Sequence, residues 1–231
     1  MITVVLPTYE EAENLRRLLP ELLAALDLAS IEAEVVVVDD ASTDGSAEVA
    51  EGLLGARGRV VRRTGRPGLA RAAIDGIRNA RGDVLVLMDA DLEHPVDLVV
   101  PLARTVLDGR AEVAVGSRFA PGGGIAGRSA WRRACSRVGA WLARGPARGI
   151  LDPLSGLLAF RRSVVEGVSL GTRGFKIGLE VLARGRYAMA VEIPYVHGQR
   201  VAGRSKFGVR ASLAFLLQIA SLRFARRTES A

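Results

Sequence analysis

Short, almost fully apolar runs recur along the first 117 residues, and longer segments with helical periodicity separate them. Such runs predict strands buried on both faces of a sheet, because a strand with one wet face alternates polar and apolar residues. Leucines at every third or fourth position, as in the segment 11–28, predict helices. We therefore expect strands at 2–6, 35–38, 60–61, 84–88 and 111–115, and helices at 11–28, 69–79 and 95–107.

Regular alternation of strands and helices predicts an α/β fold with a mostly parallel sheet flanked by helices. After Arg118 the pattern changes, with a glycine loop at 122–124, strands at 156–160 and 188–193, and helices at 128–144, 175–183 and 209–225. The chain shows no internal repeat and no linker. We expect one domain over residues 1–208, followed by an apolar and basic C-terminal helix over 209–231.

Composition narrows the class of protein. With 49% hydrophobic and 25% charged residues in 231, the chain is typical of globular proteins and unlike disordered or collagen-like ones. A net charge of +7 indicates anionic partners. The single cysteine, Cys135, excludes an intrachain disulfide and fits a reducing cytosol. We expect no signal peptide, and the apolar stretch 211–222 is shorter than the about 20 residues of a membrane span.

Polar residues gather where the expected strands end. Asp39-Asp40 follows one apolar run and Asp89-Ala90-Asp91 another, and α/β sheets bind ligands at this edge. Two carboxylates one residue apart can share a divalent cation and a diphosphate, since Mg²⁺ prefers oxygen ligands. The alternative is a solvated turn. Adjacent Asp39 and Asp40 can accept hydrogen bonds from a nucleobase or ribose, or segment 39–44 can cap the next helix through Thr43 or Asp44.

Several motifs extend this picture. Leu6-Pro7-Thr8-Tyr9-Glu10-Glu11, the segment 37–44 and the segment 88–95 resemble motifs of the family-2 glycosyltransferases, which have the GT-A fold. The later motifs are similar to those of the dolichol-phosphate mannose synthases within that family: 115–119, 152–156, 174–176 and 200–206. The resemblance covers nearly the whole chain. Two positions depart from it, because Glu93 stands where the family usually has Gln, and Glu10 where it has Asn.

The resemblance implies a role for individual residues. The nucleoside of the donor would be held by Pro7, Tyr9, Glu11, Val38 and Asp40. Mg²⁺ or Mn²⁺ would be ligated by Asp89, Asp91 and Glu93, with the Ala90 backbone near the nucleotide. Donor or acceptor phosphates would meet Arg118, Arg200 and Lys206, and the acceptor lipid phosphate would meet Arg132 and Ser136. Asp91 and Arg118 would be the residues closest to the chemistry.

The implied activity is metal-dependent transfer of mannose from GDP-mannose to dolichyl or polyprenyl phosphate, with inversion at the sugar. A related transferase with another donor, such as UDP-glucose, is the alternative, and a non-enzymatic anion-binding protein is a remote one. We expect no nucleic-acid partner, because acidic residues stand at the edge of the sheet and no basic platform interleaved with aromatic residues appears.

The helix at 128–144 is amphipathic. On a helical wheel, Cys135, Val138 and Leu142 fall within about 40° of Trp131, and basic residues lie at about 200–240° from it: Arg133, Arg137 and Arg144. This pattern is typical of a helix that lies on a membrane surface, although a solvated surface helix is the alternative. We expect a protein on the cytosolic face of the membrane. The C-terminal helix would lie in the interface, pack on the core or bind a small transmembrane partner subunit.

Overall fold

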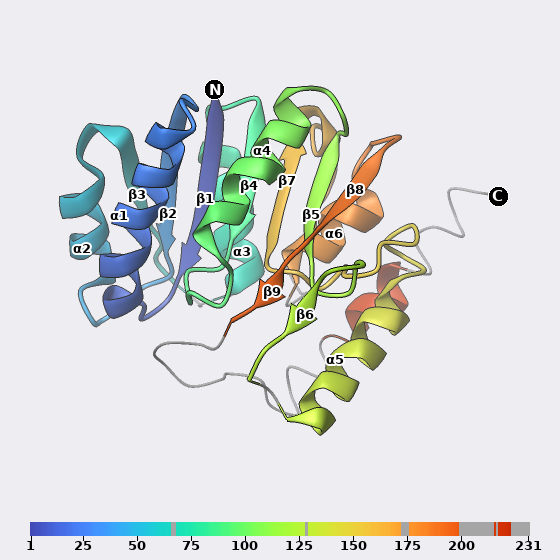
Figure 1. Ribbon diagram of the computed structural model, residues 1–231. Coiled ribbons are helices and arrows are strands. Elements are labelled where there is room, and N and C mark those ends of the chain that lie inside the picture. Colours follow the sequence, from blue (N-terminus) through green and yellow to red (C-terminus); the bar gives the residue numbers. More distant parts are fainter. Residues whose placement is uncertain (66–67, 128, 172–175, 199–214, 216, 223–231) are drawn as a thin grey trace.

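The computed structural model describes residues 1–65, 68–127, 129–171, 176–198, 215 and 217–222. It contains a seven-stranded sheet of order β3-β2-β1-β4-β7-β5-β8 with helices on both faces (Figure 1). The strands are β1 Ile2–Thr8, β2 Ala33–Asp39, β3 Gly58–Arg62, β4 Val84–Met88, β5 Val113–Ser117, β7 Leu157–Arg161 and β8 Ala190–Pro194. The helices are α1 Ala12–Leu28, α2 Ser46–Leu54, α3 Leu69–Asn79, α4 Val99–Leu107, α5 Ala130–Ala143 and α6 Ile177–Arg184, with short 3₁₀ turns at Gly55–Arg57, Val96–Leu98 and Arg162–Val164.

The first half of the sheet is parallel, as the apolar runs predicted. β1 lies between β2 and β4 and pairs in parallel with both, and β3 extends the parallel set beyond β2. Every residue of β1 and of β4 is buried, because helices cover both faces of these strands. Their carboxyl ends therefore meet at one edge of the sheet.

Strand β7 is the antiparallel member of the mostly parallel sheet that the sequence predicted. It is antiparallel to both β4 and β5, with Met88 opposite Leu157 and Val115 opposite Leu158. The chain leaves β5 at the carboxyl edge, passes through α5, and enters β7 from that same edge, so β7 must run in the opposite direction. As a result, the residues that precede β7 lie beside the residues that follow β4.

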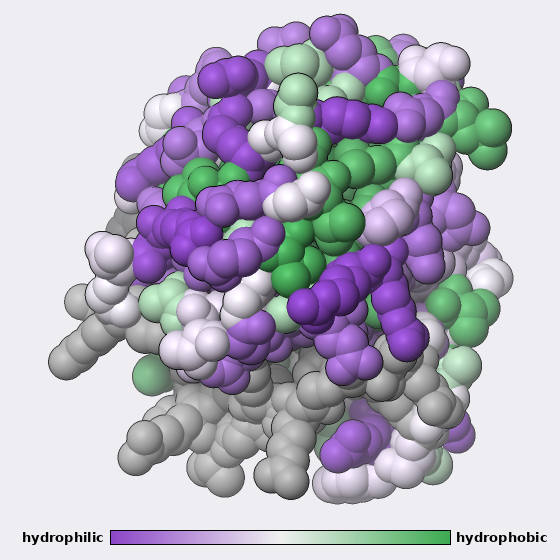
Figure 2. Space-filling view, turned by 90° about the vertical axis from the view of Figure 1, so that its left-hand side faces the viewer, coloured by the Kyte–Doolittle hydropathy of each residue, from purple (hydrophilic) through white to green (hydrophobic). Residues whose placement is uncertain are grey.

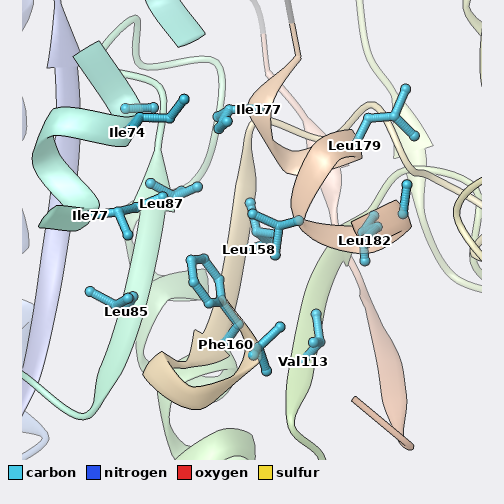
Figure 3. Packing of buried hydrophobic residues seen from close by; sticks show 14 of the residues in the cluster. Ile74, Ile77, Leu85, Leu87, Val113, Leu158, Phe160, Ile177, Leu179 and Leu182 are labelled. Atoms are coloured by element: carbon cyan, nitrogen blue, oxygen red, sulfur yellow. The ribbon is translucent and has the colours of Figure 1, made fainter. Parts of the chain in front are cut away.

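Two apolar cores pack on the two faces of the sheet. One joins α1 and α4 to the sheet through residues such as Leu18, Leu22 and Leu102. The other joins α3 and α6 to it, and Figure 3 shows Phe160 and Leu158 of β7 between Ile77 of α3 and Leu182 of α6. Since Phe160 is fully buried, truncating it to Ala should destabilise the fold by about 3–5 kcal/mol.

The edge at β3 is polar. Figure 2 shows mainly hydrophilic residues on this side of the molecule. Arg62 forms ion pairs with Glu48 and Glu51 of α2 at 2.7 and 2.9 Å, and Arg59 pairs with Glu34. Charged side chains along an edge strand disfavour pairing with another chain.

The remaining elements lie beyond the main sheet. Short strands β6 Gly124–Ile125 and β9 Val196–His197 pair in parallel, and α5 lies at the periphery (Figure 1). Phe215, Ile219 and Leu222 are buried in the core that contains α6, which favours core packing for this part of the C-terminal helix. Over the described ranges, none of the helices combines the length and apolarity needed to traverse a bilayer.

Candidate active site

The backbone adopts an uncommon conformation just after the carboxyl ends of β1, β2 and β4. Glu10, Ala41 and Leu92 have φ values of 54°, 62° and 59°, and each follows one of these strands within four residues. Non-glycine residues rarely adopt this left-handed conformation, which concentrates at functional sites where the surrounding structure enforces it. Three such residues at three neighbouring strand ends therefore mark this edge as the candidate site.

At the amino ends of α1 and α2, side-chain oxygens accept hydrogen bonds from backbone N–H groups. The Glu11 N–H donates to Ser46 Oγ at 2.9 Å, and the Ala12 N–H donates to Asp44 Oδ2 at 3.0 Å. Asp44 Oδ1 also accepts the Ser46 N–H at 3.0 Å, so of Thr43 and Asp44 it is Asp44 that binds the first N–H of α2, while Gly45 is the N-cap residue. Burial opposes ionisation, but the Ser46 and Ala12 hydrogen bonds outweigh it and lower the pKa of Asp44. These N–H groups, which bind phosphate in dinucleotide folds, already have acceptors here.

Asp39 and Asp40 have different surroundings at the end of β2. Asp40 forms an ion pair with Arg63 and accepts the Gly68 N–H. Asp39 Oδ2 accepts the Ser42 N–H at 3.1 Å, whereas the other oxygen, Oδ1, is buried and has no hydrogen-bond partner. A buried acceptor without a donor is costly, so a ligand that brings an N–H or O–H to Asp39 would be favoured. Sequence reasoning placed the donor contact at Asp40 and missed Arg63.

The three predicted metal ligands follow β4 but face different partners. Asp89 Oδ2 lies 3.8 Å from Lys176 Nζ, Asp91 Oδ1 accepts the Glu93 N–H at 3.2 Å, and Glu93 Oε2 lies 3.3 Å from His197 Nε2. Within the described part of the chain, no three His, Cys, Asp or Glu side chains converge on a common point for a metal. The chemistry of the donor set fits Mg²⁺ or Mn²⁺, since carboxylate oxygens suit hard cations.

A pocket opens beside Asp89. It is lined by Pro7, Asp89, Ser155, Gly156 and Lys176, among others. Gly156 is required here because a Cβ at this position would overlap the Asp89 carboxylate, and its carbonyl accepts the Asp89 N–H at 3.1 Å. The reversed strand β7 thus brings Ser155 and Gly156 to the metal motif. Lys176 belongs to a motif noted in the sequence, but no role was predicted for it.

Arg118 is held in a buried bidentate ion pair. Its Nε and Nη2 lie 2.7 Å from the two carboxylate oxygens of Asp152, which is fully buried. Glu192 of β8 fixes that turn, because its carboxylate accepts the N–H groups of Leu151 and Asp152 at 2.8 and 3.0 Å. Burial acts against the charged form, yet the Asp152 hydrogen bonds dominate and raise the pKa of Arg118. The sequence predicted Arg118 as a phosphate ligand without identifying this partner.

Two histidines and a tyrosine form a buried cluster behind Glu93. The Tyr195 hydroxyl lies 2.9 Å from His94 Nδ1 and 3.3 Å from His197 Nδ1. Burial, reinforced by His197 and Lys176, lowers the pKa of His94 well below its ordinary value, so this ring is neutral. The sequence predicted no role for the two histidines and no contact between them and Tyr195.

Helix α5 exposes large apolar side chains. Trp131, Val138 and Trp141 are 77%, 57% and 66% exposed, while Gly139 and Ala140 face the rest of the molecule. The sequence-based apolar face included Leu142, which instead packs partly against the core, and omitted Trp141. The predicted acceptor residues also lie on this helix: Arg132 is exposed and Ser136 is half-buried. Arg200, Lys206 and residue 128 lie outside the described residues.

Known proteins share this chain's sequence and fold. The model of glycosyl transferase family 2 matches residues 3–166. The dolichol-phosphate mannosyltransferase of Pyrococcus furiosus is 39% identical over 94% of this chain, which spans 62% of that protein. The enzyme of the same name from Saccharomyces cerevisiae is 34% identical over 95% of this chain and 86% of its own length.

Solved structures agree on the fold. Glucosyl-3-phosphoglycerate synthase from Mycobacterium tuberculosis, solved with Mn²⁺ and UDP-glucose, superposes with a TM-score of 0.67 at 23% identity, over 98% of this chain and 78% of that one. The expected GT-A-type α/β fold and the family resemblance are both confirmed. This chain belongs to glycosyl transferase family 2 and, within it, to the dolichol-phosphate mannosyltransferases.

Proposed function

We propose that this protein transfers mannose from GDP-mannose to a dolichyl or polyprenyl phosphate, with inversion at the anomeric carbon. The observation that carries the proposal is the position of two acidic strand ends on either side of β1 at one edge of the sheet: Asp39-Asp40 after β2 and Asp89-Ala90-Asp91 after β4. The chain is related to dolichol-phosphate mannosyltransferases along nearly its whole length. Acidic strand ends suit a nucleotide that is bound through N–H and O–H donors and through a cation.

The nucleoside of the donor would lie over the ends of β1 and β2. The unpartnered Oδ1 of Asp39 offers an acceptor to a base or ribose, so Asp39 joins the residues named from the resemblance: Pro7, Tyr9, Glu11, Val38 and Asp40. Because the α1 amino end is closed by Asp44 and Ser46, the diphosphate would not be neutralised by that helix. Its charge would be balanced at the end of β4 instead.

Asp89 and Asp91, with Glu93, would hold Mg²⁺ or Mn²⁺ there, with Ala90 backbone at the nucleotide. A bound divalent cation would neutralise the diphosphate leaving group. Lys176, 3.8 Å from Asp89, adds a positive charge beside the same carboxylate. Arg118, Arg200 and Lys206 would contact phosphates, and for Arg118 the Asp152 pair fixes the position of the guanidinium.

The chemistry needs no separate strong base. A phosphate monoester has a second pKa near 6 and is anionic at neutral pH. Its oxygen forms a bond to the anomeric carbon while the bond from that carbon to the diphosphate oxygen breaks, and the electron pair leaves with GDP. One displacement converts an α-linked donor into a β-linked product. The protein's contribution is placement of the two reactants and stabilisation of the leaving group.

The acceptor tail stays in the bilayer, so the protein must meet a membrane surface. We infer that α5 lies on the cytosolic leaflet, with Trp131 and Trp141 among the headgroups and with Arg132 and Ser136 near the lipid phosphate. Exposed tryptophans beside basic residues are typical of interfacial helices. A transferase that uses UDP-glucose on the same lipid is the second candidate, since residues at the end of β2 do not distinguish the bases.

Calorimetric titration separates the two candidates. With Mn²⁺ present, GDP should bind and UDP should bind at least tenfold more weakly. Asp39→Asn should weaken GDP binding more than Asp27→Asn, which changes an exposed aspartate at the end of α1. Tighter binding of UDP than of GDP would indicate that the donor is a UDP-sugar and not GDP-mannose. An equal loss of GDP affinity in the two variants would show that Asp39 does not bind the nucleotide.

A further inference from the structure

Behind the metal motif lies a buried cluster of three side chains for which the sequence predicted no role: His94, Tyr195 and His197. His94 follows Glu93 after β4, while Tyr195 and His197 come from the region of β9. Tyr195 and His94 are therefore in contact although 101 residues separate them in the sequence. All three side chains are buried. Their ring centroids lie 5.4–6.1 Å apart, so each ring packs against the other two.

The cluster is joined to Glu93 twice. His197 Nε2 lies 3.3 Å from Glu93 Oε2, and the Gly198 N–H donates to the Glu93 carbonyl at 3.1 Å. Glu93 is thus held by backbone and by side chain from the same short segment. The Tyr195 hydroxyl lies on the far side of His197 from Glu93, since it contacts Nδ1 while Glu93 contacts Nε2.

The position of the hydrogen in each of these contacts follows from which groups can only accept a hydrogen bond. An ionised Glu93 carboxylate accepts only, so His197 Nε2 carries a hydrogen. In the tautomer that carries its hydrogen on Nε2, Nδ1 accepts the Tyr195 hydroxyl hydrogen. The Tyr195 oxygen in turn accepts from His94 Nδ1–H. This order gives each of the three contacts one hydrogen.

We propose that Tyr195 is a positioning residue for Glu93: its hydroxyl fixes the tautomer and orientation of His197, and His197 fixes the Glu93 carboxylate. The inference rests on the proposed function, in which Glu93 stands beside the bound cation. A carboxylate at this position adds negative charge next to Asp89 and Asp91, and a directed imidazole N–H offsets that charge. Groups that orient the residues around a metal usually alter its affinity about 10–100-fold when they are removed.

Removing one hydroxyl tests the proposal. Tyr195→Phe should weaken Mn²⁺ binding to the GDP complex about tenfold or more, measured from the free-ion signal in electron paramagnetic resonance, and leave GDP affinity without metal unchanged. Tyr187→Phe is the matched control, since the Tyr187 hydroxyl donates to the Leu182 carbonyl at 2.7 Å near the end of α6. Equal Mn²⁺ affinity in wild type and Tyr195→Phe would overturn the proposal.

A double-mutant cycle distinguishes positioning from a merely structural role. If Tyr195 acts through Glu93, Tyr195→Phe should have no further effect on Mn²⁺ affinity in a Glu93→Ala background. The same loss in both backgrounds would mean that Tyr195 supports the fold and not Glu93. If the wild-type GDP complex binds no Mn²⁺, the proposed metal site is wrong, which is a different result from an unaffected Tyr195→Phe variant.

Nuclear magnetic resonance tests the proton order in the wild-type protein, without any variant. The chain has only two histidines, so the imidazole ¹⁵N spectrum contains two rings. One should be protonated at Nδ1 (His94) and the other at Nε2 (His197). Two rings with the same tautomer would contradict the chain of hydrogen bonds and with it the positioning role of Tyr195.

Discussion

The carboxyl edge of the sheet and the outer face of α5 both differ from the usual pattern of buried apolar and exposed charged residues, in opposite ways. At the edge, charged groups such as Asp40, Arg118 and Asp152 are buried or nearly so, and each has a partner. On α5, Trp131 and Trp141 are exposed. Buried charges and exposed large apolar groups are the informative exceptions in a globular protein. The first exception fits a polar ligand, and the second fits an apolar surface.

The difference has a physical basis. Charges at the edge are fixed by partners far away in sequence, so that region is rigid before a ligand arrives. The buried residues of helix α5 are small, Ala140 and Ala143, and its two tryptophans are exposed. Changes at the edge should therefore affect stability and catalysis, and changes of the exposed tryptophans of α5 should affect membrane binding.

Loss of the Arg118–Asp152 pair should have the largest effect on stability. Asp152→Ala leaves a buried guanidinium without its partner and should lower the free energy of unfolding by about 3–5 kcal/mol. Asp108→Ala is the control, because Asp108 and Arg110 form an exposed pair at 3.4 Å, and exposed pairs contribute at most about 1 kcal/mol. Denaturant unfolding measures both. Similar losses for the two variants would mean that burial does not set the strength of the pair.

Asp91→Asn should reduce sugar transfer about 100-fold, the scale at which stabilisation of transition-state charge is lost. The amide keeps an acceptor for the Glu93 N–H, so folding should be preserved. Asp83→Asn, at the amino end of β4, changes an exposed aspartate on the opposite edge and should leave the rate unchanged. A wild-type rate of sugar transfer in Asp91→Asn would show that Asp91 has no role in catalysis.

Replacing Trp131 and Trp141 together by Ser should weaken vesicle binding at least about tenfold, since burial of one large apolar side chain is worth about 1.5–3 kcal/mol. Leu28→Ser is the matched control, because Leu28 is 91% exposed at the end of α1. Flotation with vesicles rich in anionic lipid measures the effect. Nucleotide binding should be unchanged, and equal flotation by both variants would exclude α5 as the membrane surface.

Arg133 and Arg137 should make a smaller, salt-sensitive contribution. Each basic residue near an anionic surface contributes about 1 kcal/mol, and salt screens it. Changing both to Glu should weaken flotation at low salt and have little effect at high salt. The same deficit at every salt concentration would point to a packing defect instead.

Much of the fold could be predicted from the sequence because its signals are local. Strand β4 and helix α3 have the predicted bounds, since an apolar run or a helical period ends at a clear polar or glycine residue. The direction of β7 could not be predicted, because it depends on where the chain enters the sheet after α5.

The aspartates at the candidate site were predicted from their positions after strands and the other site residues from the family resemblance, but the partners of these residues were not predicted. Asp152 lies 34 residues from Arg118, and Tyr195 lies 101 from His94, so no local pattern joins them. Exposure of Trp141 was missed for a related reason: the wheel of α5 shows which residues share a face, but only the packed structure shows that the small residues form the buried face.

Transfer of labelled mannose tests the proposed activity directly. GDP-[¹⁴C]mannose, polyprenyl phosphate in anionic vesicles and Mn²⁺ or Mg²⁺ should give labelled lipid, which EDTA abolishes and added cation restores. UDP-[¹⁴C]glucose should label less than one tenth as much lipid, and Asp91→Asn should label almost none with either donor. Lipid labelled from UDP-glucose but not from GDP-mannose, or undiminished transfer in EDTA, would contradict the assignment of donor or metal.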